Sequence, residues 1–320
     1  MDSFPGGSHA ELPQPPEVIE AQVAPEQNPR SGRRNALIAA AGFASYILLQ
    51  ILAVRLRLSN PLAYYGVAIL ALLIALGYTV SLARALRSVA AQAAAVVVSA
   101  AITLPFVLLP FLHISTPQQL AAARRIYTVY VLVFRAAPGL RGLLLITLAT
   151  CVGVIVSRLV REIKLLLPVG VVLALVDLYV VFGGGMVTQA NSGKSPMAQA
   201  AMNTLTVGLM PRMPANVPAP PPLAVGFADF LFIALFFACF ARFRVPARRT
   251  FVLLCGILCL YLMAVIVGHL DLPALVPIAV VVIGSNLSAF RFSREETVAM
   301  VYAGLIVAGI LAAMVFASHR

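Results

Sequence analysis

Apolar runs of about 20 residues recur along most of the chain, and they constrain its fold more than any other feature. Hydrophobic residues make up 61% of the 320 positions and charged residues 11%, and the mean hydropathy is +0.98. Because a helix rises 1.5 Å per residue, about 20 apolar residues cross a hydrocarbon layer of roughly 30 Å. The pattern predicts an all-α, polytopic bundle of transmembrane helices in an integral, multi-pass membrane protein.

The runs divide the chain into about nine predicted spans. These are 35–54, 62–83, 89–112, 141–157, 165–185, 223–241, 250–268, 273–290 and 297–317. Residues 1–34 are rich in proline and acidic side chains, which predicts a disordered cytoplasmic tail. We expect N-terminal helices at 35–160, a central core at 165–290 and a C-terminal helix at 297–317.

Two segments depart from the simple pattern of spans. Residues 118–137 hold Arg124, Arg125 and Arg135 around a short apolar centre, which favours an interfacial helix, with a tenth span as the alternative. Residues 186–222 form a long loop that ends in PANVPAPPP, where proline cannot continue a helix. Loops of this length inside a tightly connected bundle are either functional or disordered.

The net charge of +12 comes largely from arginines in short loops between the apolar runs. If the tail is cytoplasmic and 118–137 does not cross, the richest basic loops lie on the cytoplasmic side, as the positive-inside rule requires. This favours nine spans, because a crossing would turn the basic loop at 242–249 outward. The charge therefore indicates no nucleic-acid partner. We expect the chain in a lipid bilayer, the plasma membrane of a prokaryote.

Two of the eleven acidic residues, Asp177 and Asp229, fall in the middle of predicted spans. A charge at the bilayer centre costs at least about 2.5–3.5 kcal/mol on insertion scales, so such residues persist mainly where they have a function. Asp177 follows Lys164 by 13 residues, and Asp229 precedes Arg242 by 13. On two antiparallel helices this spacing puts both carboxyls about 20 Å from the same surface.

Two adjacent carboxyls at low dielectric can share one proton, so that one activates water and the other donates to a carbonyl oxygen. Such a pair predicts peptide-bond hydrolysis that requires no metal and no other cofactor. No HExxH motif and no Ser–His pair at mid-span competes with it. A structural carboxyl bonded to a neighbouring helix is one alternative. A proton- or cation-coupled transporter that uses the two aspartates as a relay is another.

Three motifs occur in a fixed order. LALVDLYVVFGGG at 173–185 carries Asp177, and AVGFADFLFIALFF at 224–237 carries Asp229 three residues after Gly226. Pro273-Ala274-Leu275 follows two spans later. In this order they resemble the presenilin and signal peptide peptidase family of intramembrane aspartyl proteases, with its Gly-x-Gly-Asp and Pro-Ala-Leu (PAL) motifs.

The resemblance implies a presenilin-like bundle that hydrolyses peptide bonds within transmembrane helices or signal-peptide remnants, with Asp177 and Asp229 as the catalytic residues. The residues implied to border the substrate are Gly226, Ala228, Pro273, Ala274 and Leu275. The implied partner is a transmembrane protein or peptide, and the enzyme would act alone or as a homo-oligomer. An inactive homologue is an alternative, because Ala228 replaces the second glycine of the motif. A prepilin-peptidase-like enzyme is another, although such enzymes lack PAL and act near the membrane surface.

Overall fold

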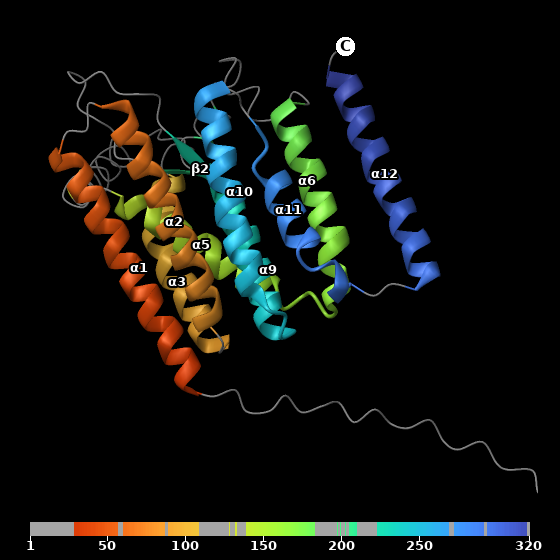
Figure 1. Cartoon of the computed structure of the whole chain (residues 1–320), viewed down its shortest axis with the longest axis horizontal. Coiled ribbons are helices and arrows are strands. Elements are labelled where there is room, and N and C mark those ends of the chain that lie inside the picture. The colour runs from red at the N-terminus through yellow and green to blue at the C-terminus, as the bar shows by residue number, and fades with distance from the viewer. Residues whose placement is uncertain are drawn as a thin grey trace, which may run out of the picture.

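The computed structural model describes residues 29–56, 60–86, 89–108, 139–182, 205–209, 223–268, 272–290 and 293–318, together with the single positions 128, 132, 197, 199 and 202. The described chain is mostly helical, and its helices stand side by side in a bundle (Figure 1). The α-helices are α1 (Pro29–Leu56), α2 (Pro61–Ala85), α3 (Val89–Leu108), α5 (Leu140–Val156), α6 (Leu166–Phe182), α9 (Phe227–Arg242), α10 (Ala247–Gly268), α11 (Leu275–Gly284) and α12 (Arg294–Ser318). Short 3-10 turns, η2 (Ile163–Leu165) and η3 (Leu287–Ala289), precede α6 and follow α11.

Helix length and surface composition mark the chain as a membrane protein. Within the described residues, four helices are long and apolar enough to cross a membrane, namely Gly32–Leu56, Leu62–Ala85, Ile163–Phe182 and Ala247–Gly268. Large apolar side chains also point away from the bundle: Leu62 is 81% exposed, Val267 74% and Val280 65%. Hydrocarbon around the bundle accounts for this surface, since soluble monomers rarely expose large contiguous apolar patches.

The structure corrects three of the predicted boundaries. Helix α1 begins at Pro29, so residues 29–34, which were expected in the disordered tail, are helical. Residues 224–226, at the start of the predicted span 223–241, form a strand, and helix α9 begins only at Phe227. The predicted all-α fold therefore lacked a small sheet, in which β1 (Thr206–Gly208) pairs antiparallel with β2 (Ala224–Gly226).

The third correction concerns the predicted span at 273–290. Helix α11 covers only 10 residues, Leu275–Gly284, and a turn and η3 follow it. Ten residues make a helix about 15 Å long, which is half of the hydrocarbon thickness. The amide of Asn286 bonds to the carbonyl of Val282 and to the Thr250 hydroxyl, which fixes the turn at the end of α11. The predicted interfacial segment 118–137 and most of the loop 186–222 lie outside the described residues.

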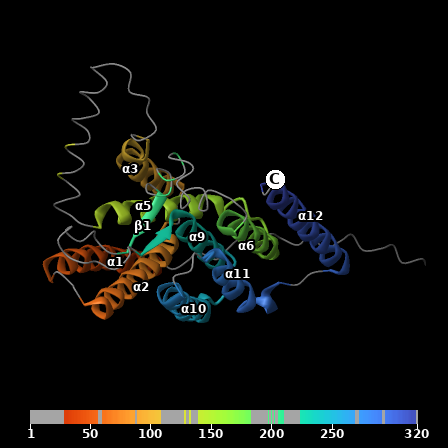
Figure 2. The same cartoon turned by 90° about the horizontal axis from the view of Figure 1, so that it is seen from above.

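Helix α9 is the central element of the bundle. It packs against α2, α5, α10 and α11, and the two views show it enclosed by its neighbours (Figures 1 and 2). Every residue from Ile233 to Phe240 is buried. A helix that is apolar on all sides is expected to lie inside a large bundle. The middle of α9 is therefore enclosed by other parts of the chain, whereas Ala228 near its start and Ala241 and Arg242 at its end are exposed.

Close contacts fix the direction of α6 relative to α9 and α11. A Cβ atom on Gly170, early in α6, would lie 3.6 Å from the Phe236 ring, late in α9, and 2.9 Å from Ile283, at the end of α11. Further along α6, Asp177 contacts Leu275 at the beginning of α11 and lines one cavity with Asp229, near the beginning of α9. Both α9 and α11 therefore run antiparallel to α6, which is the arrangement that the 13-residue spacing requires.

The contact between α5 and α9 gives a stability prediction. A Cβ atom on Gly153 of α5 would lie 2.2 Å from the Leu231 carbonyl oxygen of α9, and that backbone cannot move without disturbing the central helix. We expect Gly153→Ala to destabilise the protein by about 1–3 kcal/mol, as overpacking does. The measurement is thermal unfolding of the purified protein in detergent.

The matched control is Gly256→Ala on α10, where no atom lies within 4 Å of the added methyl group. Alanine in a helix interior is favoured over glycine, so this control should lose no stability. Equal unfolding temperatures for the two variants would contradict the close packing of α5 on α9.

Candidate active site

A cavity of about 440 Å³ lies between α2, α6, α10, the start of α11 and the junction of β2 with α9. We call it the aspartate cavity, because Asp177 from α6 and Asp229 from α9 both line it. Its other lining residues with polar side chains are Thr206 and Tyr261, and the remaining walls are apolar or glycine. Two acids that are 52 positions apart in the chain thus share one largely apolar cavity.

Asp229 lies in the first turn of α9, where its carboxylate caps the N-terminus of the helix. The N–H of Gly226, the N-cap residue, donates to Asp229 Oδ2 over 3.0 Å. An acidic side chain that reaches back to the N-cap N–H is one half of a capping box. Asp229 is only 8% exposed. A Cβ atom on Gly226 would lie 3.2 Å from the same Oδ2, so glycine leaves the space that this carboxylate occupies.

Asp177 gives a similar cap to a different helix. The N–H of Leu275, the first residue of α11, donates to Asp177 Oδ2 over 2.8 Å. The N-cap residue of α11, Ala274, provides no side-chain hydrogen bond. A carboxylate supplied by α6 therefore satisfies one of the N–H groups that a helix start leaves unpaired, and its negative charge suits the helix N-terminus. This bond joins the first aspartate to the PAL tripeptide across 98 residues of chain.

The seven residues predicted from the sequence all lie at or beside the aspartate cavity. Besides the two acids, Gly226, Ala228 and Ala274 line it. Leu275 reaches it through its backbone N–H. Pro273 is buried and lines an adjacent apolar groove between α6, α10 and α11. The structure thus brings the three separate motifs together, with Pro273 in the adjacent groove.

Strand β2 of the two-stranded sheet lines one wall of the cavity and continues directly into α9. Its paired residues are Thr206 with Gly226, Val207 with Val225, and Gly208 with Ala224. Helix α1 holds strand β1 from outside: the Tyr46 hydroxyl donates to the Gly208 carbonyl over 3.3 Å, and Gln50 Nε2 donates to the Leu209 carbonyl over 2.7 Å. Side chains in α1 therefore position the strand that pairs with β2.

Two polar contacts, one at the cavity and one beside strand β1, were not predicted from the sequence. The Tyr261 hydroxyl on α10 donates to the carbonyl of Leu272, directly before the PAL tripeptide. Gln50 holds the residue after β1. Both are polar side chains within apolar runs, and a buried tyrosine hydroxyl usually has a hydrogen-bond partner. Polar side chains in apolar runs therefore predict that hydrogen bonds form, but they do not predict which carbonyl groups accept them. No sequence pattern predicted that Thr206 lines the cavity, because the strand that contains it has only three residues.

Two carboxyls in an apolar cavity are suited to acid–base chemistry. Two like charges there repel each other strongly, so a state with one shared proton is favoured over two carboxylates. Such a pair can take a proton from water and donate one to a carbonyl oxygen. Among the residues that the structure describes, no group of three or more His, Cys, Asp or Glu side chains could hold a metal ion.

The cap on α11 can be tested separately from any catalysis. We expect Asp177→Leu to leave the Leu275 N–H without an acceptor in an apolar setting, at a cost of about 1–3 kcal/mol. Asp177→Asn keeps an oxygen acceptor, so it should cost less. Hydrogen exchange of residues 272–280, followed by mass spectrometry, should be faster in the leucine variant than in the asparagine variant. Equal protection in both variants and in the wild type would contradict the cap.

Comparison with family models, with curated proteins and with solved structures gives no match for this chain. The resemblance to presenilins and signal peptide peptidases therefore rests on the three motifs. What the chain does has to be argued from the geometry of the aspartate cavity.

Proposed function

We propose that the protein is an intramembrane aspartyl protease that hydrolyses peptide bonds within transmembrane helices or signal-peptide remnants. One observation carries the proposal: Asp177 and Asp229, from two antiparallel helices, line a single cavity. The contact of Asp177 with Leu275 supports it, because it brings the PAL segment to the acids. The cavity is better suited to a paired acid and base than to an ion path, since Thr206 and Tyr261 are its only other polar described lining residues.

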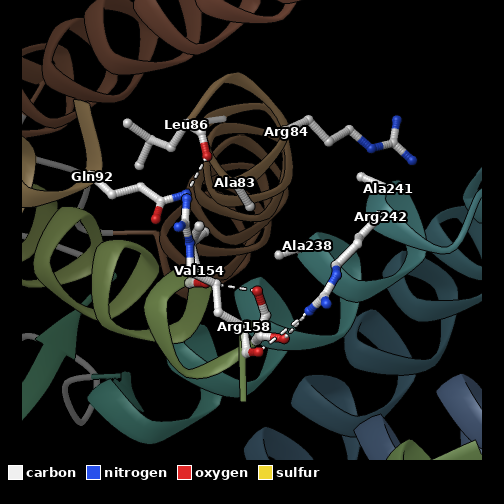
Figure 3. Close-up of a pocket in the computed structure, with 10 residues that line it drawn as sticks. Ala83, Arg84, Leu86, Gln92, Val154, Arg158, Ala238, Ala241 and Arg242 are labelled. Atoms are coloured by element: carbon white, nitrogen blue, oxygen red, sulfur yellow. Dashed lines mark hydrogen bonds between the residues drawn. The ribbon is translucent and has the colours of Figure 1, made fainter. Parts of the chain in front are cut away.

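The proposal includes a nine-span, presenilin-like arrangement in the plasma membrane of a prokaryote, with 118–137 at the membrane surface. Gln92, near the start of α3, and Arg158, just after α5, line the same pocket (Figure 3). The end of α3 and the start of α5 therefore point to the opposite side of the bundle. Because the end of α3 and the start of α5 lie on the same side, the chain between them does not need to cross the membrane, which supports a surface position for 118–137. The basic ends of α2, α5 and α9 then face the cytoplasm.

The chemistry needs one proton on the aspartate pair. The ionised carboxyl takes a proton from a water molecule as the water oxygen bonds to the scissile carbonyl carbon. The protonated carboxyl donates its proton to the carbonyl oxygen, which gives a neutral tetrahedral intermediate. As the C–N bond breaks, one hydroxyl of the intermediate gives its proton to the ionised carboxyl and re-forms the carbonyl, while the protonated carboxyl gives its proton to the leaving nitrogen, so the pair again holds one proton. Positioned general acids and bases of this kind contribute about 10²- to 10⁴-fold to a rate.

The sheet next to the acids supports a mode of substrate binding. A transmembrane helix has to unwind before water can reach its peptide carbonyls, and the freed backbone groups then need partners. Ala224, Val225 and Gly226 of β2 line the cavity. An unwound substrate segment that pairs with backbone beside the acids, as in strand addition, would satisfy those groups. The substrate of the proposed reaction is a single-span protein or peptide that enters sideways from the lipid.

The first test is cleavage of a fluorescently labelled single-span substrate in liposomes that contain the purified protein. Asp177→Asn and Asp229→Asn should each lower turnover by about 10²-fold or more, because either change removes one half of the acid–base pair. Glu295→Gln, at an exposed acid at the start of α12, is the control and should leave turnover unchanged.

Full cleavage by both asparagine variants would refute the assignment of the two acids. Proton flux that depends on the aspartates, in liposomes where no cleavage occurs, would replace the protease with the transporter. If the liposomes show neither cleavage nor proton flux, the protein is an inactive homologue.

A second test concerns the small residues beside Asp229. Gly226→Ala adds a methyl group 3.2 Å from Asp229 Oδ2, which is closer than an ordinary contact, so the carboxylate has to shift. We expect turnover to fall roughly 10- to 100-fold, because small misplacements of a catalytic group have effects of this size. Ala228→Gly, on the exposed side of the same turn, should keep or raise turnover. Unchanged turnover in Gly226→Ala would contradict the required position of the carboxylate.

A further inference from the structure

An apolar groove of about 420 Å³ lies beside the aspartate cavity, between α6, α10 and α11. We call it the side groove. Tyr261 is its one lining residue with a polar side-chain atom, and the other lining side chains are apolar. Phe182 from α6 and Val280 from α11 line it and are 58% and 65% exposed. Because hydrocarbon accounts for the apolar surface of the bundle, the side groove faces lipid.

The side groove and the aspartate cavity share two lining residues, Tyr261 on α10 and Leu272, three residues before α11 begins. Neighbouring residues on α6 are divided between the two spaces, since Leu178 lines the side groove and Asp177 lines the cavity. Both views of the bundle show α11 between α10 and α6 (Figures 1 and 2). Tyr261 and Leu272 therefore form part of the wall that separates a lipid-facing groove from the two acids.

Two hydrogen bonds hold the chain that leads into α11. The Tyr261 hydroxyl donates to the Leu272 carbonyl, which ties this chain to α10. Three residues later, the Leu275 N–H donates to Asp177 Oδ2 over 2.8 Å, which ties it to α6. We call residues 272–274 the strap. The strap is thus tied to α10 at its start, and the residue that follows it is tied to α6.

Proline reduces the backbone hydrogen bonding of the strap and of the first turn of α11. Pro273 has no N–H, and Pro277 cannot donate to the Pro273 carbonyl four residues earlier. The Ile278 N–H donates to the Ala274 carbonyl over 3.4 Å, which is long for such a bond. The position of the strap therefore depends strongly on its bonds to α10 and α6. Segments with few backbone hydrogen bonds of their own open locally at low free energy.

We propose that the side groove admits the transmembrane segment of a substrate from the lipid, and that the bond from Tyr261 to Leu272 closes the wall between this groove and the aspartate cavity. The inference rests on the proposed function, because it supplies that function with its substrate. An apolar segment suits a groove whose lining carries no charge, and the wall that it has to pass adjoins the acids. Release of the bond lets Leu272 move away from α10 while Asp177 still holds Leu275.

Tryptophan fluorescence tests whether the wall opens. The chain has no tryptophan, so a single introduced tryptophan reports on one place. Ile257→Trp places it in the side groove, and Leu262→Trp places it in the aspartate cavity, at a residue that is 6% exposed. The full chain is reconstituted in liposomes whose phospholipids carry bromine on the acyl chains, which quenches fluorescence on contact. Ile257→Trp should be strongly quenched, and Leu262→Trp only weakly.

Tyr261→Phe removes the hydroxyl that holds the strap. Combined with Leu262→Trp, it should raise the quenched fraction roughly 2- to 10-fold, which is the effect of one lost hydrogen bond on an opening equilibrium. Tyr302→Phe, at a tyrosine on α12 that is 64% exposed, is the matched control and should change nothing. Equal quenching with and without the Tyr261 hydroxyl would overturn the proposal, as would strong quenching of Leu262→Trp while Tyr261 is in place.

A second variant guards against loss of folding. Leu272→Ala removes a side chain that both spaces share and keeps the tyrosine, so it should also raise the quenching of Leu262→Trp. All variants are compared by size-exclusion profile and unfolding temperature. A folded Leu272→Ala variant that leaves the cavity tryptophan as weakly quenched as before would count against a wall at this place and would overturn the proposal.

A single-span peptide of about 20 apolar residues without tryptophan identifies the occupant. It is added to the Ile257→Trp chain in an Asp229→Asn background, so that it is not cut. The peptide should protect the groove tryptophan from the brominated lipid, because it takes the place of acyl chains there. No protection would leave lipid as the occupant and would overturn the proposal.

The two proposals can fail separately. Protection of the groove tryptophan, together with opening by Tyr261→Phe, would support the side groove as a binding site for a transmembrane segment even if the wild type cleaves nothing, and that lack of cleavage would refute the protease. Cleavage by the wild type without protection would refute the side groove as the entrance and would leave the protease in place.

Discussion

Backbone N–H groups at the start of a helix need acceptors, and inside an apolar bundle water cannot supply them in bulk. Helices α9 and α11 both begin beside the aspartate cavity and not at the end of a full-length span. Each start is satisfied by a carboxylate: Asp229 accepts from the N-cap of its own helix, and Asp177 accepts from the first residue of α11. The bond to Asp177 ties α6 to α11, and the bond to Asp229 fixes the start of α9, so both capping carboxylates line the same cavity.

The same two carboxylates therefore have a structural role whatever else they do. That role explains how an acid persists in an apolar bundle at a cost of at least about 2.5–3.5 kcal/mol for a charge at the bilayer centre. It does not by itself explain why both acids line one cavity, since two caps could lie apart. Their presence in one cavity is what favours chemistry over capping alone. A carboxylate has two oxygens, and each of these bonds uses Oδ2, so the capping bonds do not occupy Oδ1.

The sequence predicted the parts of the site that depend on regular geometry. Equal 13-residue spacings to Lys164 and Arg242 predicted two acids at one level on antiparallel helices, because helical rise is constant. It did not predict where α9 and α11 begin. The start of α11 depends on Asp177, which is 98 residues away in the chain. The start of α9 follows strand β2, which pairs with β1, and a three-residue strand has almost no signal of its own. Strand β1 is held in part by Tyr46 and Gln50, some 160 residues earlier, so only the folded arrangement reveals it.

The position of Asp229 along α9 has a consequence for the lifetime of a cleaved chain in the bilayer. Asp229 precedes Arg242, the basic end of the helix, by 13 residues, or about 20 Å of helical rise. If a substrate helix is cut at that level, one piece keeps about 20 Å of apolar length and the other roughly 10 Å, against a hydrocarbon layer of roughly 30 Å. Neither piece can then anchor itself across both leaflets. Hydrolysis at this depth would itself loosen both products from the membrane, without a separate extraction step.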